Sequence, residues 1–263
     1  MCVEDAVEAP VGHQCIDCVR AARLPDGPVG VARVTRALVI AIVAIHLLSL
    51  LDRGAVLGRF GLVPVAVGAG EWWRLGTSAL LHGSLLHLGF NGLLLHRLGE
   101  ELELRLGHAR AAALLAAGAL GGAFGVVSLA WASAATGLAD VPLLGPLLAT
   151  APTSISIGAS GAVFGLMGAF LADYRARGID PWRTDIGALV VLNLVLTFLV
   201  PAISVGGHVG GLLAGLLAGR TLLDGTSGPR GRRRATRRVA LGTVVMAVAA
   251  WWLARATLLL VLP

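Results

Sequence analysis

Charged residues are scarce in this 263-residue chain, at 14% of the total, whereas soluble domains carry about a quarter. Asp, Glu, Lys and Arg are absent from three long stretches, residues 111–139, 141–172 and 186–219. A helix crosses the hydrocarbon core of a bilayer in about 20 residues, so each stretch can hold one or two crossings. The scarcity of charge therefore excludes a soluble globular domain and predicts a polytopic membrane protein.

Other absences narrow the class further. The apolar stretches do not alternate with polar residues, which argues against a transmembrane β-barrel and favours helices, because backbone polar groups in lipid must be satisfied within the segment. Three cysteines are too few for a disulfide framework. The first 30 residues are polar and contain Pro and Gly, so we expect no cleavable signal peptide.

The apolar segments that are present predict an all-α fold with seven transmembrane helices. We expect these helices near residues 34–51, 75–98, 109–132, 158–173, 186–201, 205–223 and 239–260. The connection 52–74 is partly apolar but is interrupted by Gly and Pro, and Trp72 and Trp73 suit the headgroup level. We expect this connection to lie at the membrane interface rather than to span.

The net charge is +6, and all the positive charge is arginine, which clusters in the short segments between apolar runs. Cytoplasmic loops carry an excess of basic residues. A cytoplasmic N-terminus leaves only four of the 21 arginines outside: Arg53, Arg59, Arg74 and Arg255. We therefore predict a multi-pass plasma-membrane protein with its C-terminus outside and no nucleic-acid partner. The basic run 230–238 is interpreted as an orientation anchor, with an anionic-lipid patch as the alternative.

Three groups of polar side chains fall inside the predicted helices, where polar residues are costly and therefore candidates for function. The first group is His82, His87 and Asn91, of which the last two share a helical face because they are four residues apart. The others are Ser160 in GASG and His208 in GGHVGG. Taken singly, each has a structural alternative: a serine bonded to its own helix, a histidine in an interhelical bond, or a small-residue packing stripe.

Taken together, these residues favour nucleophilic catalysis. The glycine-rich helices that carry Ser160 and His208 both begin at the outer face, so the two residues share a depth and can meet if the helices pack closely. A histidine can take the proton of a serine hydroxyl, and His87, Asn91 and the Ser160 N–H can stabilise an oxyanion. These helix cores contain no Asp or Glu, so we predict a Ser–His dyad rather than a triad.

Metal binding is the competing chemistry for the histidines. His82 and His87 are five residues apart, which places their rings about 140° apart around a helix. Zinc proteases instead use histidines four residues apart with a Glu between them. The spacing therefore argues against a metal at these positions.

Five short segments occur along the chain in a definite order: EWWR (71–74), HGSLLHLGFN (82–91), ELRLG (103–107), GASG (158–161) and GHVGGLLAG (207–215). In these segments, and over residues 34–224, the chain resembles the rhomboid family of intramembrane serine proteases. The resemblance matches Trp73 and Arg74 to an outer-loop element, Glu103 and Arg105 to an acidic-x-Arg element, and Gly158 and Gly161 to the glycines around the nucleophile.

The resemblance implies cleavage of transmembrane substrates near the outer face without a cofactor or metal. It makes Ser160 the nucleophile, His208 the general base, and His87, Asn91 and the Ser160 N–H the oxyanion hole. His82 is expected to line the site. Family members often have Tyr four residues after the serine; here Phe164 stands there, and we expect its ring to stack on His208 and activity to survive.

The same resemblance divides the chain into three parts. Residues 1–33 form a cytoplasmic tail, residues 34–224 a six-helix protease core, and residues 225–263 a basic cytoplasmic loop followed by an extra seventh helix. The fifth helix and the loop after it are expected to gate lateral substrate entry.

The N-terminal tail contains a C-x₂-C pair in HQCIDC (13–18), with Cys2 upstream. One such pair is half of a zinc site. A four-ligand zinc site through Cys2, His13, Cys15 and Cys18 is one interpretation, and a tail without metal is the favoured one.

Two other functions compete with an active protease. A proteolytically inactive relative that escorts membrane helices is expected to lack the serine or the histidine, and this chain has both. A small-solute transporter is expected to show an inverted repeat with broken helices in both halves, and no such repeat is evident.

Overall fold

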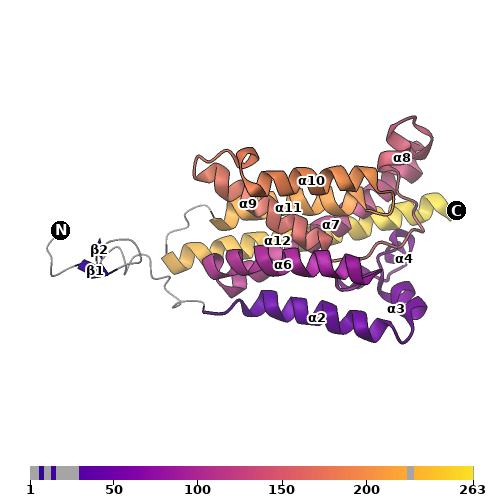
Figure 1. The fold of residues 1–263 in the computed structure, drawn as a ribbon. Helices are drawn as coiled ribbons and strands as arrows, with labels where there is room; N and C mark the ends of the chain where they lie inside the picture. The colour runs from indigo at the N-terminus through magenta and orange to yellow at the C-terminus, as the bar shows by residue number, and fades with distance from the viewer. Residues whose placement is uncertain (1–5, 9–12, 16–29, 224–227, 263) are drawn as a thin grey trace.

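The computed structural model describes residues 6–8, 13–15, 30–223 and 228–262 (Figure 1). Its long helices run roughly side by side, as expected for an all-α membrane protein. The tail adds one short antiparallel pair, β1 (Ala6–Glu8) with β2 (His13–Cys15). Cys2 and Cys18 lie outside the described residues, so the zinc hypothesis for the tail stays a prediction. Within the described part, no three His, Cys, Asp or Glu residues are grouped to hold a metal.

One long helix corresponds to each of the seven predicted segments. These helices are α2 (Arg33–Ser49), α6 (Leu85–Leu106), α7 (His108–Thr136), α9 (Ser160–Ala176), α10 (Asp185–Leu199), α11 (Val205–Leu223) and α12 (Gly228–Val261). By length and hydropathy, α7 and α12 are each sufficient to cross a membrane alone, and α10 is a shorter apolar helix.

The second predicted helix is wrong at its N-terminal end. In place of one helix over 75–98, α5 (Arg74–Thr77) and η2 (Ser78–Leu80) are followed by a 96° bend before α6. Ser84 makes the new start, because its side chain accepts from the His87 N–H at 3.1 Å as an N-cap. His82 therefore lies in the bend, and only His87 and Asn91 are on the helix.

The last helix begins earlier than predicted. The structure has α12 starting at Gly228, so the basic run 230–238 is helical rather than a loop. Arginine is a good helix former, and the run contains no proline after Pro229. At 1.5 Å per residue, the 34 residues of α12 span about 51 Å, well beyond a hydrocarbon core of about 30 Å.

The two longest connections between the long helices, 50–84 and 137–159, lie at the end of the molecule where α12 ends (Figure 1). The segment 52–74 forms α3 (Arg53–Phe60) and α4 (Pro64–Gly68), too short to span. The connection between α7 and α9 contains η3 (Leu138–Asp140) and α8 (Leu144–Leu148). The opposite end carries η4 (Pro181–Arg183), between α9 and α10.

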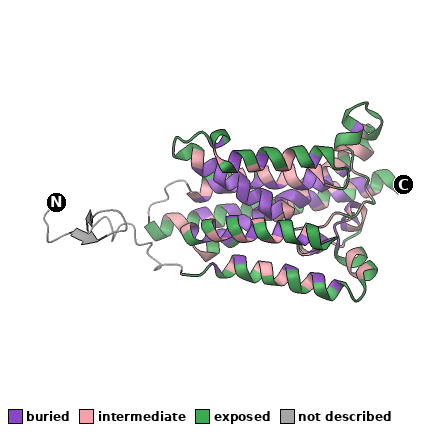
Figure 2. Cartoon of the chain, in the orientation of Figure 1, coloured by how far each residue is buried: buried purple, intermediate pink, exposed green. Residues whose placement is uncertain are grey.

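The core is centred on α9, which packs against α6, α7 and α11 (Figure 2). Of its 17 residues, 13 are buried. Glycine lets three backbones meet: a Cβ on Gly118 of α7 would lie 2.9 Å from the Gly161 carbonyl oxygen, and one on Gly211 of α11 would lie 2.9 Å from Gly161 Cα. The glycine stripes on α9 and α11 therefore do pack, and α7 contributes a third stripe.

Candidate active site

Ser160 is the first residue of α9. Gly158 precedes it with φ +127°, a conformation suited to glycine, and a Cβ there would lie 2.7 Å from His87 Nε2. The Gly158 N–H donates to the Ser78 carbonyl at 2.9 Å, which fixes the entry to the helix. Because Ser160 begins the helix, its N–H has no acceptor within α9. The start of α9 therefore presents a hydroxyl and a free N–H side by side.

His208 is the fourth residue of α11, directly after the turn that starts the helix. The Ser204 hydroxyl accepts from the Gly207 N–H at 3.1 Å and the Ser204 carbonyl accepts from the His208 N–H at 3.1 Å. Phe164, one turn beyond Ser160, stacks on the His208 ring with centroids 4.1 Å apart and planes 24° apart. The stacking expected from the sequence is confirmed.

Ser160 and His208 thus sit at the starts of two helices whose backbones touch. Within the described residues, no hydrogen bond joins the Ser160 hydroxyl to the His208 ring. Catalytic hydrogen bonds are often long in free enzymes and tighten when substrate binds. The structure therefore brings the two residues to the same region, but the Ser160 hydroxyl and the His208 ring do not form a hydrogen bond.

Thr197 is a neighbour of His208 that the sequence did not indicate. Its hydroxyl lies 2.7 Å from His208 Nδ1, and the residue is only 2% exposed near the C-terminal end of α10. The available signal was a lone hydroxyl in an apolar helix, which is a candidate for function in a membrane protein.

The expected oxyanion donors occupy the first turns of α6. Asn91 is buried and donates one amide proton to the His87 carbonyl at 3.0 Å, which leaves its second amide proton available. The His87 ring lies beside Gly158, as its distance to a Cβ built there shows. Both side chains are therefore on the face of α6 near the start of α9.

His82 is buried beside the start of α9, and its expected role in lining the site stays a prediction. It is 1% exposed, its Nε2 accepts from the Ala159 N–H at 3.4 Å, and its carbonyl oxygen accepts from the His46 Nδ1–H at 3.1 Å. Its ring also packs edge-on against His87, with centroids 5.0 Å apart. The bend before α6 turns His82 into the protein interior, where it contacts Ala159 and His87 next to the serine.

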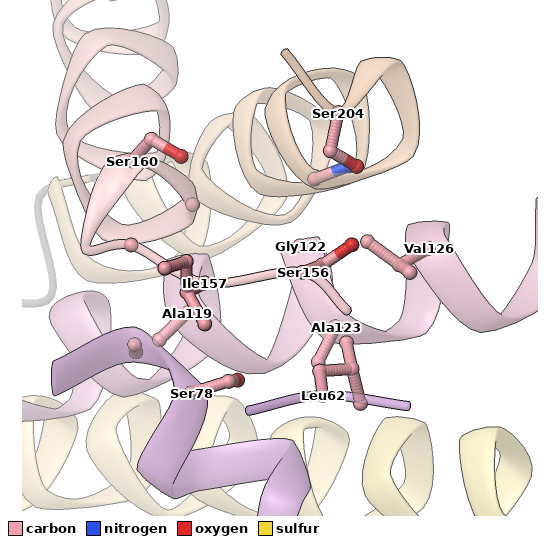
Figure 3. A pocket seen from close by; sticks show the side chains of 14 residues that line it. Leu62, Ser78, Ala119, Gly122, Ala123, Val126, Ser156, Ile157, Ser160 and Ser204 are labelled. Atoms are coloured by element: carbon pink, nitrogen blue, oxygen red, sulfur yellow. The ribbon is translucent and has the colours of Figure 1, made fainter. Parts of the chain in front are cut away.

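A small cavity of about 40 Å³ opens beside Ser160, large enough for about two waters. Figure 3 shows its lining, in which Ser160 begins α9, Ser204 directly precedes α11, and Ser78 and Leu62 come from the connection between α2 and α6. A second cavity of about 320 Å³ lies between the α8 segment and the end of α10, and shares Ser156 and Ser204 with the first. Hydroxyl groups thus line a wettable region next to the serine.

The connection 52–74 is hydrogen-bonded to the segment before Ser160. Arg74 is 6% exposed and donates to the Gly61 carbonyl at 2.7 Å and to Glu71 at 2.7 Å. Leu62, next in the chain, pairs with Ser156 through two backbone bonds of 3.0 and 2.9 Å. Trp73 is partly exposed and donates to the Arg59 carbonyl at 3.3 Å. Arg74 therefore positions backbone four residues upstream of the serine.

Glu103 and Arg105 lie at the other end of the molecule, far along α6 from His87. Glu103 is fully buried and accepts from the N–H groups of Val34 and Thr35, at 2.9 and 2.8 Å, at the start of α2. Arg105 pairs with Asp173 of α9 at 2.6 Å. These two residues join helices and are not brought to the serine.

Comparison with known proteins places the chain in a family. Residues 69–225, more than half of the chain, match the family model described as Rhomboid domain. Rhomboid protease GluP of Bacillus subtilis (strain 168) is 33% identical over 54% of this chain and 24% of its own length. RHOMBOID-like protein 5 of Arabidopsis thaliana is 34% identical over 53% of this chain and 38% of its own.

A further relative is the putative rhomboid protease YdcA of Bacillus subtilis (strain 168), 30% identical over 55% of this chain and 64% of its own length. The matched regions thus cover less than two thirds of these three relatives. On the family match and on its arrangement of apolar helices, the chain belongs to the rhomboid family of membrane proteins.

Proposed function

We propose that this chain is an intramembrane serine endopeptidase that works with Ser160 and His208. His208 Nε2 takes the Ser160 hydroxyl proton as Oγ attacks a substrate carbonyl carbon, which forms a tetrahedral oxyanion. The imidazolium then gives that proton to the leaving amine as the C–N bond breaks. Water attacks the resulting ester with His208 again as base, which releases the second product and restores Ser160.

The observation that carries this proposal is the contact between the starts of α9 and α11. Gly161 and Gly211 let the two backbones touch, and the Phe164 ring holds the His208 imidazole against α9. Ser160 and His208 reach this proximity although they lie 48 positions apart in the sequence. Packing alone requires the glycines but neither the hydroxyl nor the imidazole.

The oxyanion is assigned to three donors. The Ser160 N–H is free of helical bonding because it begins α9, Asn91 has an amide proton to spare, and the His87 ring borders Gly158. A preorganised donor of this kind contributes about 10²–10³ in rate. We expect Asn91→Ala to reduce the rate by one to three decades without abolishing it.

The substrates are transmembrane helices of other proteins in the same bilayer, cut near the outer face. A helix shields its peptide bonds with internal hydrogen bonds, so it must unwind locally before cleavage. Glycine, proline and β-branched residues near the cut favour that step. The serine cavity, lined by hydroxyls, supplies the water that lipid lacks. No cofactor is required by this chemistry.

The proposed orientation has residues 1–33 in the cytoplasm and the C-terminus outside the plasma membrane, with residues 34–224 as the protease core and α12 as an additional helix. An epitope tag at each end, probed with antibody before and after permeabilisation, tests it. Staining of the C-terminal tag in intact cells supports the orientation, and staining of the N-terminal tag there contradicts it.

Cleavage of a reporter transmembrane substrate by purified protein in liposomes tests the activity. Ser160→Ala and His208→Ala should each abolish cleavage while thermal unfolding stays unchanged. Ser128→Ala is the matched control, because among the described residues the Ser128 hydroxyl bonds only the Phe124 carbonyl of its own helix, at 2.7 Å. Cleavage at the wild-type rate by Ser160→Ala or His208→Ala would contradict the proposal.

A further inference from the structure

Thr197 makes two hydrogen bonds with a single hydroxyl group. Its Oγ1 lies 2.6 Å from the Asn193 carbonyl oxygen of its own helix and 2.7 Å from His208 Nδ1 of α11. The residue is one of only four buried residues in α10. Among the described residues it is the one whose side chain contacts the His208 ring through a hydrogen bond.

Proton accounting assigns the direction of these bonds. A threonine hydroxyl has one proton, and a carbonyl oxygen can only accept. The Thr197 proton therefore goes to the Asn193 carbonyl, and the bond to His208 requires Nδ1 to be the donor. A neutral imidazole that carries its proton on Nδ1 has its lone pair on Nε2.

We propose that Thr197 is a positioning residue that holds His208 in the Nδ1–H tautomer, with Nε2 as the base for Ser160. This inference rests on the proposed function. Phe164 stacks on the ring face and fixes its plane, but a 180° flip about the Cβ–Cγ bond keeps that plane and exchanges the positions of Nδ1 and Cδ2. The hydrogen bond to Nδ1 removes that freedom, as a third residue does in hydrolytic triads.

Thr197 connects His208, the proposed base, to α10. This helix exposes most of its residues, including Val195, Leu196 and Phe198 on either side of Thr197. The hydrogen bond from α11 reaches it near its C-terminal end, where the 320 Å³ cavity also borders Thr197. An outward movement of this end of α10 breaks the bond, so the tautomer of His208 depends on where α10 sits.

Thr197→Val tests the proposal, because valine keeps the shape and removes the hydroxyl. One neutral hydrogen bond corresponds to about 3- to 10-fold in rate. We expect kcat for the reporter, and the rate of labelling by a fluorophosphonate probe, to fall by about that factor with KM unchanged. Thr197→Ser restores the hydroxyl and should restore both rates.

Thr257→Val is the matched control. Thr257 is also buried, and within the part of the chain that the structure describes its hydroxyl bonds only the Leu253 carbonyl of its own helix, at 2.8 Å. We expect this variant to label and cleave at the wild-type rate. It therefore separates the loss of a buried helical hydroxyl from the loss of the bond to His208.

A structural role for Thr197 does not move the tautomer, so ¹⁵N chemical shifts of the His208 ring provide the decisive readout. We expect the wild type to show a protonated Nδ1 and a bare Nε2, and Thr197→Val to show a mixture of tautomers. A wild-type ring protonated on Nε2, or unchanged rates and shifts in Thr197→Val, overturns the proposal. The wild-type shifts decide the matter even where the valine variant does not fold.

The two proposals fail in distinguishable ways. Cleavage by Ser160→Ala contradicts the protease itself. Loss of cleavage in Ser160→Ala, together with normal rates and an unchanged tautomer in Thr197→Val, leaves the protease intact and removes only the role of Thr197.

Discussion

The consecutive helices α9 and α10 are similar in length and apolar composition, yet they are held very differently. Of the 17 residues in α9, 13 are buried, whereas α10 buries four of its 15. The glycines of α9 bring its backbone against α7 and α11, while α10 presents large side chains outward. Ser160 lies on the more deeply buried helix, α9. The His208 ring is contacted by both helices, by Phe164 of α9 and by Thr197 of α10.

The largest effect should come from closing the glycine contact of α9. Gly215→Val places a side chain against the Gly165 backbone, where no space exists for a Cβ. Overpacking of this kind costs about 3 kcal/mol or more, and we expect loss of folded protein in thermal unfolding. Gly242→Val on α12 is the control, since a Cβ there meets nothing within 4 Å. Equal unfolding temperatures for the two variants would contradict the packing account.

A second comparison shortens one leucine on each helix. Leu166 of α9 is 1% exposed and Leu196 of α10 is 43% exposed. Leu166→Ala should destabilise the protein by about 2–5 kcal/mol because it leaves a cavity, whereas Leu196→Ala should stay within about 0.5 kcal/mol. Denaturant titration in detergent measures both. A cost for Leu196→Ala that matches Leu166→Ala would show α10 to be packed as firmly as α9.

Charge at the ends of the two helices that η4 connects gives a smaller contrast. Asp173 of α9 is buried and pairs with Arg105 at 2.6 Å and Arg177 at 3.0 Å, whereas Asp185 begins α10 exposed. Asp173→Asn should cost about 1–3 kcal/mol of unfolding free energy, and Asp185→Asn about 0.5 kcal/mol or less. Thermal unfolding of the pair, repeated at high salt, checks the order. An Asp185→Asn variant that is the less stable of the two would reverse it.

The smallest effect concerns the stacking of α9 on the base. Phe164→Leu keeps an apolar side chain and removes the aromatic contact, which contributes about 0.5–1.5 kcal/mol, and so should lower kcat about 2- to 10-fold. Phe164→Tyr keeps the ring and should cleave at close to the wild-type rate. Cleavage assays of the two variants compare them, and a slower tyrosine variant would point to steric demands around His208 instead of stacking.

The sequence predicted the helices well where long apolar runs define them, as for α7 and α11. It failed at the bend before α6, because Gly83 and Ser84 interrupt a run that hydropathy reads as continuous. It also missed the helical start of α12, since a basic run is as compatible with a loop as with a helix. Both errors concern the residue at which a helix begins, which hydropathy and composition do not determine.

The candidate site likewise contains residues that the sequence predicted and contacts that it did not. The residues predicted around the serine come from motifs with recognisable residue types, and the stack of Phe164 on His208 was expected correctly. Thr197 carries no motif, and its contact depends on how α10 lies against α11. The inward position of His82 likewise follows from the bend. Contacts that depend on tertiary packing could therefore not be predicted from the sequence.

Labelling with a serine-directed fluorophosphonate tests the central claim most directly, because it requires an activated hydroxyl and no knowledge of the natural substrate. Purified wild-type protein should label at one site, mapped by mass spectrometry to Ser160, and both Ser160→Ala and His208→Ala should remain unlabelled. An unlabelled wild type, or equal labelling of Ser160→Ala, would contradict the account of Ser160 as a nucleophile activated by His208.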